Sequence, residues 1–140
     1  MKYYLFLTLI VCVSLLVFQV GCGPKQAYKV VPIKGTLTWQ GTPVPHCQME
    51  FMPEDTSGRI SVAVTDSEGR FEAQYTHDIK GIQKGKTVLR VSFAGDLTEP
   101  GVVETLDGDM QAIVKKYGKD TPGLTLDITK RDNNFLIDMQ

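Results

Sequence analysis

The stretch that decides the fold reads Thr65-Asp66-Ser67-Glu68-Gly69-Arg70-Phe71. Asp66 at the first position of a four-residue turn and Gly69 at the fourth are typical of a type I turn followed by a left-handed residue. Gly69 has no Cβ, so it adopts a positive φ at low cost. Two alternating runs, 60–64 and 71–75, flank the stretch. The sequence therefore predicts a short β-hairpin with these runs as its arms.

Further strands follow from the same two-residue period on both sides of the hairpin. In the run 29–40, one face carries Ile33, Gly35, Leu37 and Trp39, and the other carries Lys34, Thr36, Thr38 and Gln40. In the run 86–93, the residues expected to point inward are Thr87, Leu89, Val91 and Phe93. This alternation predicts half-buried strands that contribute one face each to a shared core.

Seven runs with strand character follow residue 28, namely 29–40, 47–51, 60–64, 71–75, 86–93, 124–128 and 135–139. Polar residues at 76–85 predict a loop, and 131–134 predict a turn that joins the last two strands. Short strands separated by turns predict an all-β fold, a seven-stranded Greek-key β-sandwich over residues 29–140.

One short helix is expected between the fifth and sixth strands, near residues 109–117. Asp109 suits the N-cap, and Gly118 suits the C-terminal cap. Between them, apolar residues recur at helical spacing at Met110, Ile113, Val114 and Tyr117. We expect this helix to pack on an edge of the sheets.

The first residues have the character of an export signal. Lys2 gives a positive start, residues 3–20 are almost wholly apolar, and Gly21-Cys22 follows. Gly21-Cys22 resembles a lipobox, although Gln19 stands where that pattern usually has Leu. Residues 1–21 are thus predicted to be a lipoprotein signal peptide, with Cys22 as the lipidated residue and 22–28 as a lipidated tether. The alternative is an uncleaved anchor, because eighteen residues is the lower edge of a membrane-spanning helix.

Composition places the chain among single-domain globular proteins. It has 140 residues, of which 42% are hydrophobic and 22% charged. The formal net charge is -1, so no cationic excess indicates nucleic acid as a partner. Cys12 lies in the signal segment and Cys22 would be acylated. Cys47 is then the one remaining thiol of the domain, which excludes an internal disulfide.

The order of the motifs resembles a known family. The segments that carry the resemblance are 34–38, 41–45, 51–55, 65–71, 85–89, 114–118 and 123–126. In this order and spacing they resemble small bacterial lipoproteins with a carboxypeptidase-regulatory-like, or transthyretin-like, β-sandwich domain. The resemblance covers residues 29–140. It implies a seven-stranded sandwich and an exported, lipid-anchored product, and it supplies no catalytic residues.

Candidate catalytic and metal-binding residues are few. His46 and Cys47 are adjacent, but neighbouring residues on a strand point to opposite faces, which argues against a catalytic dyad. His46, His77 and Cys47 lack the close spacing of metal ligands, so we expect neither a metal nor another cofactor. Transthyretin-like enzymes that hydrolyse a purine-derived lactam end in Tyr-Arg-Gly-Ser, whereas this chain ends in Ile137-Asp138-Met139-Gln140.

Two acidic features have alternative interpretations. Asp66, Glu68 and Gly69 resemble part of a calcium loop, but a plain hairpin turn is favoured because the closing Glu is missing. Five acids without a base lie in the segment 96–109, at Asp96, Glu99, Glu104, Asp107 and Asp109. They form either a solvated loop, which is favoured, or a patch for a cationic partner.

The leading hypothesis is a non-enzymatic, membrane-anchored lipoprotein of the bacterial cell envelope, whose β-sandwich serves binding, adhesion or envelope structure. Its expected partners are the membrane, through the lipid on Cys22, and a protein or polysaccharide of the envelope. Gly23 after Cys22 favours the outer membrane by analogy, because it is not the Asp that retains enterobacterial lipoproteins at the inner membrane. The alternatives are a hydrolase, in which His46, His77 and an acid would meet, and a carrier with an apolar cavity for a small ligand.

Overall fold

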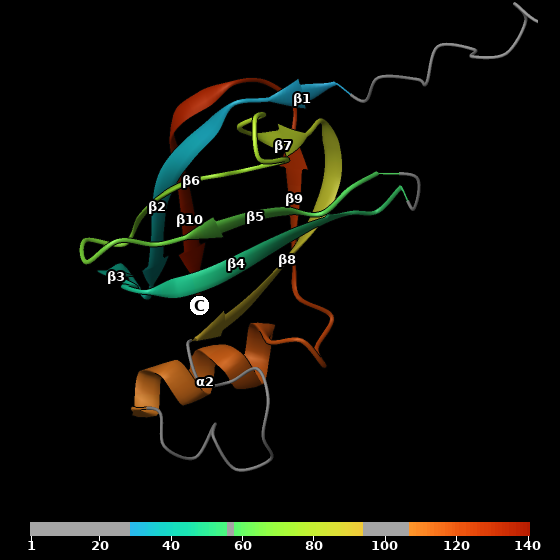
Figure 1. The fold of residues 1–140 in the computed structure, drawn as a ribbon. Coiled ribbons are helices and arrows are strands. Elements are labelled where there is room, and N and C mark those ends of the chain that lie inside the picture. The colour runs from blue at the N-terminus through green and yellow to red at the C-terminus, as the bar shows by residue number, and fades with distance from the viewer. Residues whose placement is uncertain (1–28, 56–57, 94–106) are drawn as a thin grey trace, which may run out of the picture.

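The computed structural model of the chain describes residues 29–55, 58–93 and 107–140 (Figure 1). The predicted signal peptide at 1–21, the tether at 22–28 and its Cys22 lie outside the described residues. The acids Asp96, Glu99 and Glu104 also lie outside them. Among the described residues, none of the helical structure is both long and apolar enough to cross a membrane.

The described residues form a mostly β structure with a single helix. The strands are β1 (Val30–Val31), β2 (Ile33–Trp39), β3 (Thr42–Pro43), β4 (Cys47–Pro53), β5 (Ser61–Val64), β6 (Arg70–Glu72), β7 (Ile82–Gln83), β8 (Gly85–Phe93), β9 (Leu124–Ile128) and β10 (Asp132–Met139). The helix α2 (Gly108–Tyr117) lies between β8 and β9. The strands make two four-stranded sheets and a two-stranded sheet of β1 and β7.

The first four-stranded sheet is antiparallel, in the order β5-β4-β8-β9. On β8, the alternation predicted from the sequence is confirmed, since Thr87, Leu89, Val91 and Phe93 are all buried. On β4, Cys47 and the other two inward residues of the strand are buried in the same way. On β5, the small residues Ser61 and Ala63 point inward, and Val62 and Val64 are left exposed.

The second four-stranded sheet is built around β2, which pairs with β10, β3 and β6. The prediction that a turn at 131–134 joins the last two strands is wrong, because most of these residues belong to β10. β9 belongs to the first sheet, whereas β10 begins at Asp132 and runs parallel to β2 in the second. The backbone N–H of Asp132 donates to the Pro32 carbonyl at 3.2 Å. This hydrogen bond joins the start of β10 to the start of β2, in keeping with their parallel pairing.

Thr38 lies on the outward face of β2, as the alternation predicts, but it is not exposed to solvent. Thr38 is buried, and its hydroxyl donates to Asp138 Oδ1 of β10 at 2.5 Å. Because β10 lies alongside β2, its side chains cover a position that the alternation alone assigns to solvent.

The turn of the central hairpin is confirmed, but its two arms enter different sheets. Gly69 has φ 73°, and its N–H donates to the Asp66 carbonyl at 3.0 Å. Beyond the turn, β5 pairs with β4 in the first sheet, and β6 pairs with β2 in the second. Phe51 and Phe71 meet between the two sheets, with ring centroids 6.0 Å apart. The two sheets therefore pack against each other around one apolar core.

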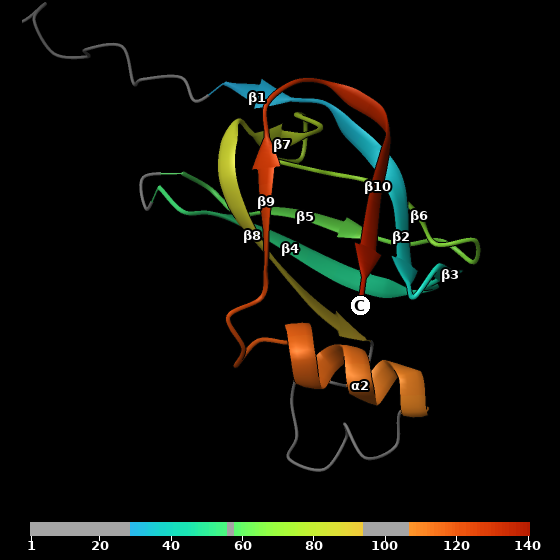
Figure 2. The ribbon, with the colours of Figure 1, turned by 180° about the vertical axis from the view of Figure 1, so that it is seen from behind.

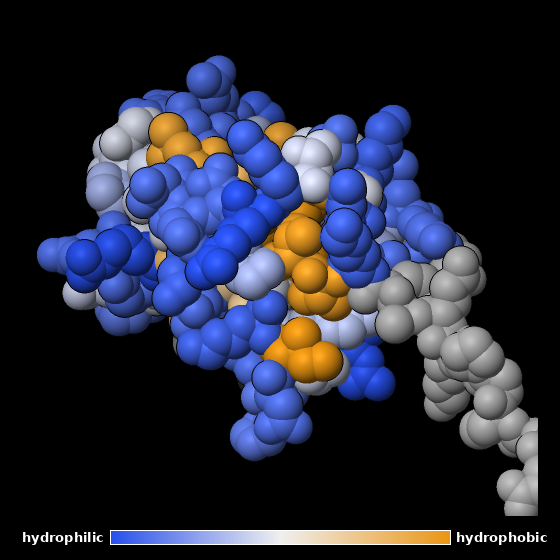
Figure 3. Space-filling model, turned by 90° about the horizontal axis from the view of Figure 1, so that it is seen from above, coloured by the Kyte–Doolittle hydropathy of each residue, from blue (hydrophilic) through white to orange (hydrophobic). Residues whose placement is uncertain are grey.

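One end of this core is closed by the pair β1 and β7 (Figures 1 and 2). The prediction that 76–85 is only a polar loop missed β7, in which Ile82 and Gln83 are both buried. Figure 3 looks onto this end and shows hydrophobic side chains gathered among a mainly hydrophilic surface. A two-residue strand is too short to show a period in the sequence, which explains the omission.

The opposite end is closed by α2, which lies where β8 and β10 finish (Figures 1 and 2). The predicted helix exists, but its N-cap is Asp107 and not Asp109. The Asp107 carboxylate accepts a hydrogen bond from the Met110 N–H at 2.9 Å, which satisfies one of the free amides of the first turn. The helix ends before Gly118, as predicted.

Two contacts fix α2 to the sheets. The Tyr117 ring meets Trp39 of β2 edge to face, with centroids 6.4 Å apart. The Tyr117 hydroxyl donates to the carbonyl of Gln140 at 2.9 Å. Because Ile113 is also buried, one face of the helix completes the core.

Candidate binding pocket

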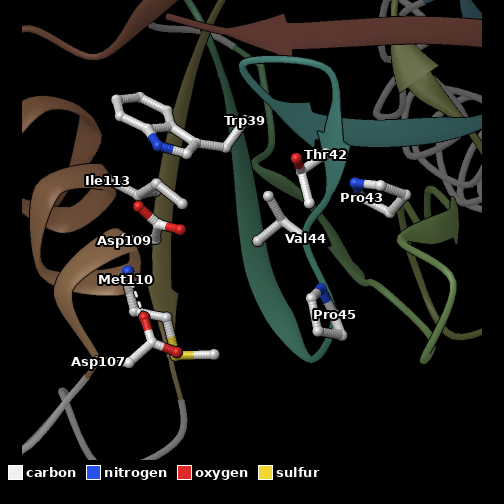
Figure 4. Close-up of a pocket in the computed structure, with 9 residues that line it drawn as sticks. All are labelled: Trp39, Thr42, Pro43, Val44, Pro45, Asp107, Asp109, Met110 and Ile113. Carbon is white, nitrogen blue, oxygen red and sulfur yellow. Dashed lines mark hydrogen bonds between the residues drawn. The ribbon is translucent and has the colours of Figure 1, made fainter.

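A pocket of about 140 Å³ lies between the first turns of α2 and the segment that links β2 to β4 (Figure 4). It is lined by Trp39, Thr42, Pro43, Val44, Pro45, Asp107, Asp109, Met110 and Ile113. Figure 4 shows the helical residues on one side and residues 42–45 facing them on the other. The pocket is therefore a gap between two separate elements and does not lie between the sheets.

The wall opposite the helix is held by a tight reversal of the chain. Gln40 and Gly41 both have positive φ, 50° and 80°, which turns the chain back after Trp39. β3 then pairs with the end of β2, so that Trp39 lies opposite Thr42. The Val44 N–H donates to the Leu37 carbonyl at 3.0 Å. These bonds to a central strand make the wall a fixed surface.

The helical wall is held by burial and by the cap. Ile113 is 1% exposed and anchors α2 in the core, while Met110, one turn earlier, is partly buried. The cap of Asp107 fixes where the helix begins. The first turn consequently presents Asp107 and Asp109 at the rim of the pocket, above an apolar floor.

This lining combines apolar side chains with two carboxylates. None of its residues is a Ser, Cys or His, and its hydroxyl and carboxylate side chains are those of Thr42, Asp107 and Asp109. Most of it is apolar, and the carboxylates of Asp107 and Asp109 supply negative charge. Within the described residues, neither carboxylate forms an ion pair. The arrangement can therefore hold an apolar group that carries a positive end.

Part of the lining of this pocket was singled out from the sequence. Asp107 and Asp109 belong to the acidic segment for which a cationic-partner patch was the less favoured alternative. Trp39 and Val44 were assigned only to the fold or to a link between strands. The one available signal was Trp39 itself, the single Trp of the chain, at a strand end just before a turn. Nothing in the sequence brings Trp39 to the helix.

The histidine and cysteine candidates lie apart from the pocket. His46 is exposed with φ 53°, while Cys47 beside it is fully buried, so the prediction that they point apart is confirmed. Burial raises the pKa of the Cys47 thiol to about 12. Such a thiol is not a nucleophile near neutral pH. His77 is exposed in the turn before β7, and its carbonyl accepts from Gln74 Nε2 at 2.9 Å.

The calcium-loop alternative at 66–69 is not supported by the contacts of its carboxylates. Asp66 Oδ1 accepts from the N–H groups of Glu68 and Arg70, each at 2.9 Å. The Arg70 guanidinium pairs with both acids. The hydrogen bond from the Arg70 amide lowers the pKa of Asp66. Among the described residues, no three His, Cys, Asp or Glu side chains cluster as ligands for a metal ion.

A second, smaller hollow of about 90 Å³ lies on the outer face of the first sheet. Its charged residues are Glu50, Arg90 and Lys119, which are of both signs. Glu50 and Arg90 lie directly opposite each other on β4 and β8. Since its charges are of both signs and its volume is smaller, this hollow is the weaker candidate.

Comparison with protein families, with curated proteins and with solved structures found no match to this chain. What the protein does is therefore inferred from its own residues and geometry.

Proposed function

We propose that the protein is a lipid-anchored, non-catalytic binding protein of the bacterial cell envelope. The observation that carries the proposal is the pocket between α2 and residues 42–45, whose mostly apolar lining also carries two carboxylates. Acyl chains on Cys22 would hold the domain at a membrane, the outer one by preference. Confinement to a membrane surface raises the effective concentration of the domain near its partners. A small pocket that binds weakly is then sufficient.

Two further features support the proposal. Residues 3–20 form an apolar run that stops at Gly21-Cys22, and the first strand begins at Val30, shortly after the proposed tether. Seven of the strands have three or more residues, and they belong to two sheets that face each other. Such an arrangement is what a transthyretin-like sandwich requires. A seven-stranded Greek-key sandwich is the fold that we propose for residues 29–140.

The size of the pocket distinguishes binding of a partner from carriage of a free ligand. Pockets for drug-sized ligands measure about 300–1,000 Å³. At about 140 Å³, this pocket holds a side chain or a group of similar size. We therefore favour recognition of a protein partner over the carrier function.

The anchoring part of the proposal is tested by labelling cells with a clickable fatty acid. The wild-type chain should carry the label, and the Cys22→Ser variant should not. Equal labelling of the two forms would contradict lipidation at Cys22.

The binding part is tested by crosslinking the full-length chain to its neighbours in the envelope. Thr42→Trp places a large side chain in the pocket from an exposed position. The matched control, Thr125→Trp, makes the same change at an exposed position of β9. A partner identified by mass spectrometry should be lost with Thr42→Trp and retained with Thr125→Trp. If both variants keep all partners of the wild type, the pocket is not the binding site.

A further inference from the structure

We propose that the pocket between α2 and residues 42–45 accepts the side chain of a lysine or arginine from a protein partner. The inference rests on the proposed function, since it names the group that the binding pocket recognises. A basic side chain combines an aliphatic stem with a terminal positive charge. The pocket has surfaces that match both parts.

The stem is matched by the apolar lining. Trp39, Val44 and Met110 line a hollow that is bounded by two prolines and by Ile113. Pro43 and Pro45 have no N–H groups, so this wall offers a stem carbon surface in place of backbone donors. The hollow of about 140 Å³ suits one side chain and is too small for a larger ligand.

The charged end is matched by two carboxylates. One oxygen of Asp107 is engaged by the Met110 N–H at 2.9 Å, which leaves the other oxygen for a ligand. Asp109 lies one residue into the helix and lines the same pocket. The basic residues of α2, Lys115 and Lys116, are in its last turn, and Lys116 Nζ donates to the Gln140 carbonyl. Along the helix, positive charge is thus kept away from the pocket.

Stabilisation of the helix dipole would explain why acids stand in the first turn of α2. It does not explain the apolar hollow beside them. A neutral ligand would cover the carboxylates and remove their water without replacing it, and an anion would be repelled. A cation satisfies the carboxylates and also interacts favourably with the face of Trp39. The segment 94–106 of the chain does not fit as an occupant, because it carries three acids and no Lys or Arg.

Trp39 supplies a direct measurement, because it is the one Trp of the chain and it lines the pocket. The full-length protein in a neutral detergent is titrated with end-blocked tripeptides Gly-Lys-Gly, Gly-Arg-Gly and Gly-norleucine-Gly. We expect saturable changes in Trp39 fluorescence with the two basic peptides. The norleucine peptide has a similar stem without the charge and should bind about five- to tenfold more weakly.

The double variant Asp107→Asn, Asp109→Asn removes both charges and keeps a good N-cap, because Asn caps helices as well as Asp. It should lose the preference for the basic peptides while melting within a few degrees of the wild type, because the loss of two first-turn charges weakens the helix only slightly. The matched control, Glu54→Gln with Asp127→Asn, removes two exposed acids that do not line the pocket and should bind as the wild type does.

The proposal is overturned if norleucine and lysine peptides bind equally, if neither basic peptide gives a saturable change, or if the double variant keeps the preference. These outcomes are separable from failure of the proposed function. If no tripeptide binds but Thr42→Trp still removes the envelope partner, the pocket binds a partner through a different group. If Thr42→Trp removes no partner, the pocket is not the binding site and the proposed function fails with it.

Discussion

At the scale of single residues, Cys47 shows how position on a strand determines reactivity. It is the first residue of β4, it points into the core, and its solvent-exposed fraction is 0%. Its amide donates to the Thr65 hydroxyl at 2.8 Å, which ties the start of β4 to the end of β5. The side chain therefore acts as a small apolar group of the core.

We expect the Cys47 thiol to resist a thiol reagent in the native protein at neutral pH. Burial blocks access, and a pKa of about 12 leaves very little thiolate. Labelling should become fast only when denaturant unfolds the domain, and the rate should follow the fraction unfolded. Fast labelling of the double variant Cys12→Ser, Cys22→Ser, in which Cys47 is the one remaining thiol, without denaturant would show that Cys47 is accessible.

At Gly69, both the positive φ and the nearness of neighbouring atoms exclude a side chain. Its φ is 73°, and a Cβ there would lie 2.9 Å from the Leu37 carbonyl oxygen. Gly69→Val should lower the free energy of unfolding by about 1–3 kcal/mol, because a β-branched residue is strained at positive φ. Urea denaturation measures the change.

The matched control for Gly69 is Gly108→Ala in the first turn of α2, where a Cβ would meet nothing within 4 Å. It should leave stability unchanged or raise it slightly, since Ala favours a helix. If Gly69→Val were as stable as this control, the turn at 66–69 would have to adopt another conformation.

At the scale of elements, the parallel pair of β2 and β10 depends on a close approach of two backbones. A Cβ on Gly35 would lie 1.8 Å from the Phe135 carbonyl oxygen. The register of the pair shifts between Asp132 and Phe135, which marks a bulge at this point. The absence of a side chain at Gly35 is therefore what permits β10 to pair there.

We predict that Gly35→Ala displaces β10 and lowers the free energy of unfolding by about 1–3 kcal/mol or more, as overpacking does. Because backbone atoms lie in the way, the neighbour cannot adjust by a rotamer change. Amide hydrogen exchange should show loss of protection first in β10 and the adjoining part of β2. Protection that falls equally in β8 would instead indicate general loss of stability.

At the scale of the whole molecule, a few carboxylates link segments that are distant in the sequence. Asp138 of β10 accepts from the Thr38 hydroxyl of β2 and from the Gly41 N–H at 3.0 Å. Glu72 of β6 pairs with Lys34 at 2.9 Å and with Lys80 at 2.7 Å. The hydrogen bond from Thr38 lowers the pKa of Asp138, and those from Lys80 and then Lys34 lower the pKa of Glu72.

These shifts predict that acid destabilises the fold. A carboxyl whose pKa is lower in the folded than in the unfolded chain stabilises the fold above its unfolded pKa, and this contribution is lost as pH falls through the folded value. The urea concentration at the midpoint of unfolding should therefore decrease as the pH is lowered from neutral to about 3. Asp138→Asn should lower the midpoint at neutral pH and reduce the loss in acid. An unchanged acid loss in this variant would mean that Asp138 does not contribute.

The sequence by itself determined the local structure of this protein. The two-residue period placed the inward residues of β8 and of β4, because alternate side chains of a strand point to opposite faces. Asp66 and Gly69 determined the turn, since its backbone angles depend on those residue types alone. Helical spacing from Met110 to Tyr117 identified α2, but the prediction placed its N-cap at Asp109, whereas the cap is Asp107.

Only the tertiary structure decided which elements meet. Backbone hydrogen bonds between strands are the same whatever the side chains, so no local pattern states that β6 pairs with β2, or that β10 runs parallel to β2. Hydropathy alone favours Val62 and Val64 for the core, whereas the pairing of β5 with β4 turns Ser61 and Ala63 inward. The candidate pocket likewise joins Trp39 to Asp109 across a long stretch of chain. Such contacts arise from packing of the complete core, so they cannot be predicted from the local patterns of a single sequence.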